Sequence, residues 1–306
     1  MEEGLDNRVS LVVVNYNAGQ LLAKCVQSSL DQVDEIIIVD NASDDSSLDD
    51  CEQKHPVDHG IKYIRNNVNL GYAAACNIGL SHVSNDLILF LNPDCQLDKH
   101  AVAEMKHDLL SGADVGMTGG LLLNPDGSEQ GGGRRAIPTP WRSFVRAFGL
   151  YRLSKRWPRL FNDFYLHELP LPEKAQEVEA ISGACMMVKR KAVDDVGLWD
   201  EEYFLHCEDL DWCMRFRIKG WKILFVPSAR ITHALGTCSK GRPLFVEWHK
   251  HKGMMRFYRK FFLHQYPYGL MWLVGLGVWM RFSFVSLFKL IGLGRAKFVA
   301  TKTLTE

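Results

Sequence analysis

The sequence lacks any excess of charge, because 36 lysine and arginine residues are balanced by 36 aspartate and glutamate residues. Proteins that bind nucleic acid without a defined site depend on net positive charge, so we expect no nucleic-acid partner.

Closely spaced cysteine pairs are also missing. The eight cysteines show no CxxC motif, and a chain of 306 residues buries enough core to be stable without disulfides. We therefore expect reduced thiols in a cytosolic setting.

A secretory signal is the third missing feature. The first six residues, Met-Glu-Glu-Gly-Leu-Asp, form neither a basic region nor an apolar one. The sequence therefore predicts that the chain stays on the cytoplasmic side of the membrane.

Short β-branched apolar runs alternate with helical patterns between residue 9 and about residue 118. The runs predict strands over residues 10–14, 35–39, 62–64 and 87–91. Helical spacing appears over 21–30 and 72–83. This alternation is typical of βαβ units and predicts an α/β fold with a Rossmann-like, mostly parallel sheet flanked by helices.

The rest of the chain is less regular up to about residue 180. Glycines and prolines interrupt every long pattern over 124–180, so we expect loops and short helices that cover the sheet edge. Beyond it, the patterns predict a strand over 184–188, a helix from about 208 to 219, and two closing strands over 223–226 and 229–232.

The composition changes after about residue 242. Basic and aromatic residues alternate over 250–260, and an apolar segment over 269–288 is interrupted by Arg281. The uncharged run is shorter than the roughly 20 residues that a spanning helix needs. This pattern predicts a helical region that lies in the headgroup layer of an anionic membrane. The alternative is a pair of helices packed on the preceding domain.

Polar residues follow three of the predicted strands directly: Asn15 and Asn17, Asp40 and Asn41, and Asn92 and Asp94. Ligands of open α/β sheets bind beyond the carboxyl ends of the strands, so these residues predict one site. Asp40 can accept a hydrogen bond from a nucleobase or a ribose, although such residues are also common in turns.

Asp94 follows a strand too apolar to be exposed, after a proline that fixes the turn. One carboxylate together with substrate phosphates is typical of a Mg²⁺ or Mn²⁺ site, whereas the alternative is a cap for a helix from about Asp98.

Asn69 and Gly71 precede a helix that begins with small residues, which allows a ligand to approach closely. The alternative for Asn69 is an N-cap.

Three carboxylates, Glu208, Asp209 and Asp211, lie within four residues. Repulsion between like charges raises one pKa in such a cluster, which suits a general base. The alternative is a group of acids that stabilises a helix N-terminus. His233 follows the last predicted strand, where it is either a metal ligand or a satisfied polar residue.

Together, these motifs resemble the large inverting glycosyltransferase family 2, with the GT-A fold, over about residues 9–240. Within it the chain resembles most the bacterial rhamnosyltransferase-type branch of polysaccharide assembly. The matching stretches are 12–17, 39–45, 69–77, 91–94, 197–211 and 232–236.

The resemblance implies transfer of a sugar from a nucleotide diphosphate sugar to a hydroxyl of a lipid-linked saccharide. The donor it favours is dTDP-rhamnose, or a related dTDP- or UDP-sugar. Together with the change of composition after residue 242, it predicts a GT-A domain over 1–241 and a membrane-associating region over 242–306. We expect this region to bind peripherally at the cytoplasmic face of the plasma membrane. A catalytically silent sugar-nucleotide-binding protein of an assembly complex is the alternative.

The resemblance also implies roles for single residues. Asp209 would be the base, oriented by Glu208 and Asp211, and Asp94 and His233 would hold Mg²⁺ or Mn²⁺. The nucleotide-sugar set would be Asn15, Asn17, Asp40, Asn41, Asn69, Gly71, Asn92, Asp94 and Arg135. Asn92 departs from the family motif, which begins with aspartate, so metal binding without nucleotide should be weak.

Overall fold

The computed structural model describes residues 7–57, 60–234 and 242–303. The chain forms two compact units, which are described separately: Met1–Phe204 with Glu208–Cys238, and Leu205–Cys207 with Ser239–Glu306. The predicted boundary between residues 241 and 242 adjoins segment 235–241, outside the described residues. The first six residues and the last part of stretch 232–236 also lie outside them.

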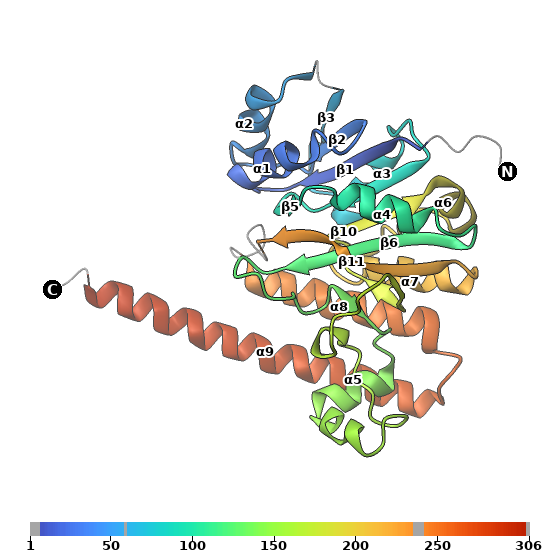
Figure 1. Ribbon diagram of the computed structural model, residues 1–306. Helices are drawn as coiled ribbons and strands as arrows, with labels where there is room; N and C mark the ends of the chain where they lie inside the picture. The colour runs from blue at the N-terminus through green and yellow to red at the C-terminus, as the bar shows by residue number, and fades with distance from the viewer. Residues whose placement is uncertain (1–6, 58–59, 235–241, 304–306) are drawn as a thin grey trace. The chain divides into compact units, whose positions relative to one another are not determined.

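A mixed sheet forms the centre of the first unit (Figure 1). Its strand order is β3 (Ile61–Arg65), β2 (Glu35–Asp40), β1 (Val9–Asn15), β4 (Leu87–Leu91), β10 (Cys185–Lys189), β6 (Val115–Leu123), β11 (Lys222–His233) and β5 (Cys95–Leu97), with β8 (Gln176–Glu177) beside β11. The first four strands are parallel, β10 is antiparallel to β4 and β6, and β11 is parallel to β6. The predicted α/β architecture is confirmed.

Helices cover both faces of this sheet. On one face, Leu11 and Val13 of β1 share a core with side chains of α1 (Gln20–Ser29), α2 (Ser47–Lys54) and α4 (Ala101–Leu109). On the other face, Phe90 of β4 packs against Trp212 of α7 (Glu208–Ile218), and α3 (Tyr72–Leu80) packs on β1 and β2. Strand β4 and the central residues of β2 are apolar because both faces of these strands are buried.

Two of the long strands differ from the sequence-based expectation. The sequence patterns did not indicate β6, because its three glycines weaken a strand signal. There Gly119 leaves room for Ile181, whose side chain a Cβ would meet at 2.5 Å. The two closing strands expected over 223–226 and 229–232 are one strand, β11, with a register shift between Val226 and Arg230. Pro227 lies in that shift, where its missing N–H leaves the ladder irregular but unbroken.

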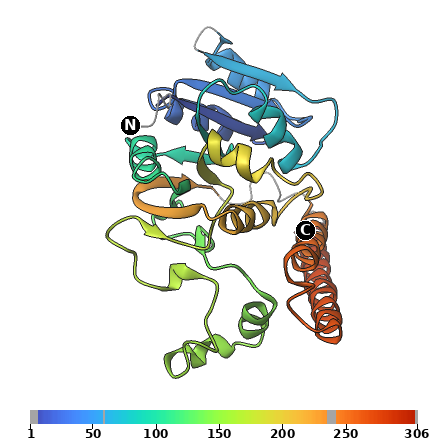
Figure 2. The ribbon, with the colours of Figure 1, turned by 90° about the vertical axis from the view of Figure 1, so that its right-hand side faces the viewer.

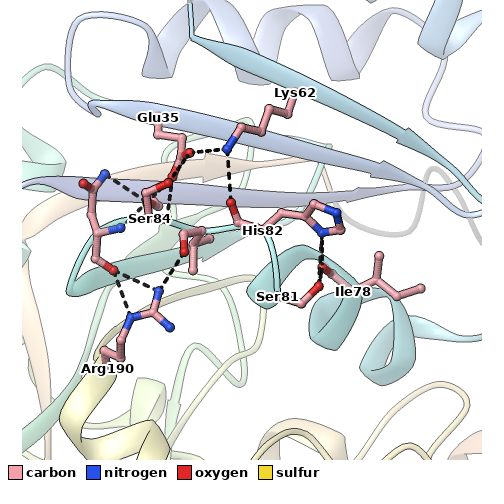
Figure 3. A network of polar contacts seen from close by, with 10 residues as sticks. Glu35, Lys62, Ile78, Ser81, His82, Ser84 and Arg190 are labelled. Atoms are coloured by element: carbon pink, nitrogen blue, oxygen red, sulfur yellow. Dashed lines mark hydrogen bonds and ion pairs between the residues drawn. The ribbon is translucent and has the colours of Figure 1, made fainter.

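A polar network fixes the edge of the sheet where β1 and β2 begin (Figure 3). Glu35 accepts hydrogen bonds from Ser10 (2.6 Å), Lys62 (2.8 Å) and the Ser84 backbone (2.9 Å). Burial of Glu35 opposes its ionisation, but these donors outweigh it and lower the pKa of Glu35 to about 2. Arg190 donates to two backbone carbonyls of the adjoining turn. The starts of these strands are therefore held firmly by protein contacts. Ligands of such sheets bind at the opposite, carboxyl ends of the strands.

Segment 124–180 contains loops and short elements, as the sequence indicates. Besides β8, they include β7 (Arg134–Arg135), α5 (Pro140–Ala147), η2 (Leu150–Lys155) and η3 (Leu166–Glu168). Only β8 joins the large sheet, whereas β7 pairs with β9 (Ala180–Ile181) in a small separate sheet. The part around α5 extends away from the large sheet (Figure 2), so the expectation that it covers the sheet edge is wrong for this part.

The second unit contains the helices α8 (Pro243–Phe262) and α9 (Tyr268–Thr303), which pack together through Trp248 and Trp279. Within α9, residues Gly269–Ile291 form a stretch of 23 residues that is long and apolar enough to cross a membrane. The short uncharged run expected from the sequence is thus part of a longer apolar helix. Its cations are engaged by α8: Lys289 binds Glu247 (2.8 Å) and Arg281 lies 3.2 Å from His251.

Candidate active site

Asn15 and Asp40 meet where the neighbouring strands β1 and β2 end. The Asn15 side-chain nitrogen donates to Asp40 Oδ1 (2.7 Å) and to Ser47 Oγ (2.8 Å), and Asp40 also accepts from the hydroxyl and backbone N–H of Ser43. Both side chains are buried. Among the described residues, Asn15 Oδ1 has no hydrogen-bond partner. The sequence predicted Asn15 and Asp40 but not the two serines.

Asn41 and Asn69 shape the loop before α3. The Asn41 amide donates to Asn69 Oδ1 and to the Gly71 carbonyl, each at 3.0 Å. Gly71 precedes the helix with φ 90°, and a Cβ there would lie 2.7 Å from the Phe204 carbonyl. Only glycine fits this backbone. Asn69 is therefore not the N-cap, which is Gly71 itself. Asn17 lies nearby and hydrogen-bonds the exposed Asp44.

Asp94 and His233 form a buried pair, because β5 pairs with β11 and brings the turn after β4 against the end of β11. His233 Nε2 lies 3.1 Å from Asp94 Oδ1. On the other side of the ring, Nδ1 lies 2.6 Å from Gln130 Oε1. The Gln130 amide nitrogen donates to Asn124 Oδ1 and the His233 carbonyl, so its oxygen faces the ring and Nδ1 carries the proton.

This arrangement suits a cation. With the Nδ1 proton directed at Gln130, Nε2 of His233 and the Asp94 carboxylate lie close enough to serve as two ligands of one positive ion. Cys95 is the third potential ligand, but burial raises the pKa of its thiol well above the usual range. Mg²⁺ and Mn²⁺ prefer oxygen and nitrogen to sulfur. Asp94 does not cap α4, whose N-cap is His100.

Asn92 contributes to the turn through its backbone. Its N–H donates to the Ala184 carbonyl (2.9 Å), and its carbonyl accepts from the Cys95 N–H (3.0 Å). The departure from the family motif thus leaves Asp94 as the sole carboxylate in segment 91–94.

Asp209 lies in the first turn of α7 and is linked to this turn through residues 183 and 184. Its Oδ2 accepts from Gly183 N (3.1 Å) and from Arg135 of β7. A Cβ on Gly183 would lie 3.2 Å from the Asp209 Cβ, so glycine permits the close approach. Because Ala184 also binds Asn92, the carboxylate and the Asp94 turn belong to one region. Gly183 was missed, although it directly precedes a clear strand.

Glu208 and Asp211 have different surroundings. Burial, and then the neighbouring Asp209, raise the pKa of Glu208 to about 8, so the effect expected of clustered acids is largest at Glu208. Asp211 is fully buried and binds Arg215 (2.7 Å), which also donates to the Val196 carbonyl. This contact anchors α7 to the loop before it.

The pH dependence of stability tests the burial of Glu208. The group binds its proton more tightly in the folded chain than in the unfolded one, so stability should fall as the pH rises from about 4.5 to about 8. The slope from this one group is at most about 1.4 kcal/mol per pH unit. Urea unfolding of the protein and of Glu208→Gln over this range measures it. Equal slopes for the two would contradict the prediction.

Comparison with known proteins identifies the family. The model named "Glycosyl transferase family 2" matches residues 10–197, and the model named "Glycosyl transferase family group 2" matches residues 152–294. The first match covers more than half of the chain. The chain therefore belongs to glycosyl transferase family 2.

Three known proteins show the similarity in detail. The N-acetylglucosaminyl-diphospho-decaprenol L-rhamnosyltransferase of Mycobacterium tuberculosis is 27% identical over 238 residues, which are 73% of this chain and 75% of the relative. The structure of GalNAc-T7 with UDP, GalNAc and Mn²⁺ matches with TM-score 0.57 and 18% identity, over 74% of this chain and 43% of its own. The mannosyltransferase PcManGT of Pyrobaculum calidifontis with GDP-Man and Mn²⁺ matches with TM-score 0.54 and 16% identity, over 83% and 63%. The resemblance to the rhamnosyltransferase-type branch and the GT-A fold are confirmed.

Proposed function

We propose that the protein transfers one sugar, with inversion, from a nucleotide diphosphate sugar to a hydroxyl of a lipid-linked saccharide in cell-surface polysaccharide synthesis. The observation that carries this proposal is the link between the Asp94–His233 pair and Asp209 through residues 183 and 184. It supports a cation-binding pair and a candidate base in one region of the sheet edge. The mycobacterial relative is named an L-rhamnosyltransferase, which favours rhamnose as the transferred sugar. We propose dTDP-rhamnose as its donor form, before other dTDP- or UDP-sugars.

Asp94 and His233 would hold Mg²⁺ or Mn²⁺ together with the donor phosphates. When bound, the cation offsets the negative charge that grows on the leaving diphosphate. The chain itself supplies the orientation, because Gln130 fixes the tautomer of His233 and the paired strands β5 and β11 fix its position. The nucleobase and ribose of the donor would bind at a polar rim formed by Asn15, Asp40, Asn41 and Asn69.

Gln130 should control metal affinity without touching the metal. Gln130→Leu removes the acceptor at His233 Nδ1, and loss of such a partner typically weakens metal binding by about 10–100-fold. Gln130→Glu keeps an acceptor at the same place and should retain affinity. Mn²⁺ titration with a nucleoside diphosphate present measures both, and Gln53→Leu on the exposed side of α2 is the matched control. Equal affinity in the leucine variant and the control would contradict the role of Gln130.

Asp209 would accept the proton of the acceptor hydroxyl as that oxygen attacks the anomeric carbon. The attack comes from the face opposite the leaving diphosphate, so the configuration inverts and no covalent enzyme intermediate forms. Arg135 and the Gly183 N–H hold one oxygen of the carboxylate in place. Because Arg135 contacts Asp209, its guanidinium group could also bind a phosphate of the acceptor.

The second unit would attach the protein to the cytoplasmic face of the plasma membrane. Its helix α9 exposes large apolar side chains, while its two cations in Gly269–Ile291 are engaged by Glu247 and His251 of α8. An apolar helix whose cations are hydrogen-bonded within the protein suits a bilayer better than water.

A donor screen tests the proposal. The purified protein is incubated with dTDP-, UDP- and GDP-sugars, Mn²⁺ or Mg²⁺ and a polyprenyl diphosphate saccharide, and the anomeric configuration of the product is determined by NMR. We expect metal-dependent transfer with inversion and preference for dTDP-rhamnose. A retained configuration would overturn the mechanism. Tight donor binding without turnover would instead favour the silent sugar-nucleotide-binding protein.

A further inference from the structure

Residues 140–171 form an arm of the first unit that exposes an unusual number of large apolar side chains. Trp141, Phe144 and Phe148 form a ladder along α5, with ring centroids 5.5 and 4.6 Å apart. Phe148 is 69% exposed, and Leu153 and Leu160 are exposed as well. A soluble surface rarely carries such a contiguous apolar patch unless the patch binds something.

Four cations are interleaved with these side chains: Arg152, Lys155, Arg156 and Arg159, all of them exposed. Within the part of the chain that the structure describes, none of the four has a carboxylate partner. The whole arm contains six cations but only two carboxylates, Asp163 and Glu168. Both of these bind Arg146. The exposed cations therefore lack counterions within the arm.

The arm is firmly connected to the candidate active site. Arg146 holds its centre, because it lies over the rings of Tyr151 (4.5 Å) and Tyr165 (4.9 Å). Tyr165 forms a β-bridge with Arg135, the residue that binds Asp209. The next residue, Ala136, donates its N–H to the Phe164 carbonyl (2.9 Å). The arm is thus held close to the residues that bind Asp209.

We propose that this arm is a membrane-binding surface for anionic phospholipid, distinct from helix α9. Its cations would contact the lipid phosphates, and its aromatic and leucine side chains would enter the interface between headgroups and acyl chains. Nucleic acid fits less well, because bases stack on aromatic rings and not on exposed leucines such as Leu153, Leu160, Leu169 and Leu171. Membrane binding by the arm does not depend on the proposed reaction. Its use in presenting a lipid-linked acceptor rests on that function.

A spin label on the arm tests the contact directly. Leu160→Cys is labelled in the full chain with Cys238→Ser, since the seven other cysteines are buried. The matched control is Val57→Cys, an exposed apolar residue outside the arm. With vesicles of phosphatidylcholine and phosphatidylglycerol, the label at 160 should gain accessibility to oxygen and lose accessibility to a water-soluble nickel complex. The label at 57 should stay in water.

Three outcomes would overturn the proposal. In the first, the protein pellets with these vesicles while the label at 160 stays in water. In the second, the protein does not pellet with them at all. In the third, the label is already protected before lipid is added, which would show that another part of the chain or a second copy covers the arm.

Charge variants test the role of the cations. Lys155→Gln, Arg156→Gln and Arg159→Gln together should weaken binding to phosphatidylglycerol vesicles by about fivefold per cation, or roughly a hundredfold in all. The control removes the same charge from exposed lysines outside the arm: Lys24→Gln, Lys54→Gln and Lys99→Gln. Equal losses in the two triple variants would contradict a specific surface. Donor hydrolysis without lipid should be unchanged, so a failure of the proposed catalysis is recognised separately.

Discussion

Asp209→Asn is expected to lower the turnover number for sugar transfer by about 10²–10⁴-fold, because an amide cannot accept the proton of the attacking hydroxyl. Donor binding should be nearly unchanged, since Asp209 contacts Arg135 and Gly183 and none of the polar residues at the ends of β1 and β2. The experiment compares initial transfer rates with the affinity for the nucleoside diphosphate, measured by calorimetry.

The control for this variant is Asp195→Asn, which neutralises an exposed aspartate on helix α6 (Arg190–Val196). Thermal unfolding separates a catalytic effect from a structural one, because loss of the partner of Arg135 can also lower stability. A turnover number for Asp209→Asn within a few fold of the control, at full folding, would show that another group is the base. Glu208 would then be the next candidate.

Asp94→Asn should abolish most metal-dependent transfer, with a loss of about 10³-fold. The effect is large because Asn92 is already neutral, so the substitution leaves segment 91–94 without any carboxylate. His233 would then face an amide in place of the carboxylate that lies 3.1 Å from its Nε2. Mn²⁺ titration in the presence of a nucleoside diphosphate should show weaker binding, and excess Mn²⁺ should restore part of the activity.

Asp98→Asn is the matched control, because Asp98 lies four residues further on and forms an exposed ion pair with Arg230. It should bind Mn²⁺ as the unmodified protein does. If Asp94→Asn kept both its Mn²⁺ affinity and its transfer rate, the metal site would have to be sought elsewhere in the chain.

The polar residues at the carboxyl ends of the strands could be predicted from the sequence, because each follows an apolar run. Asn15, Asp40 and Asp94 each come after an apolar run, and parallel strands bring such positions together. Glu208 and Asp209 were predicted from the local density of carboxylates. In both cases the signal lies within a few residues.

The remaining features depend on contacts between distant segments. Gln130 reaches His233 across 103 positions of the chain, and Gly183 approaches Asp209 across 26. Strand β6 was missed because its glycines matter only when the packing of Ile181 is known. Which acid of the cluster keeps its proton depends on burial, and burial is set by the folded chain. Local patterns contain none of this information.

The polar network around Glu35 has a practical consequence for changing the donor that the protein accepts. Ser10, Lys62, Ser84 and Arg190 secure the ends of the strands farthest from the polar rim, without contributing a side chain to it. A mutant library aimed at a new nucleotide or sugar can therefore vary the loops after β1, β2 and β4 and keep this network constant. The scaffold and the specificity of the enzyme would then be altered independently.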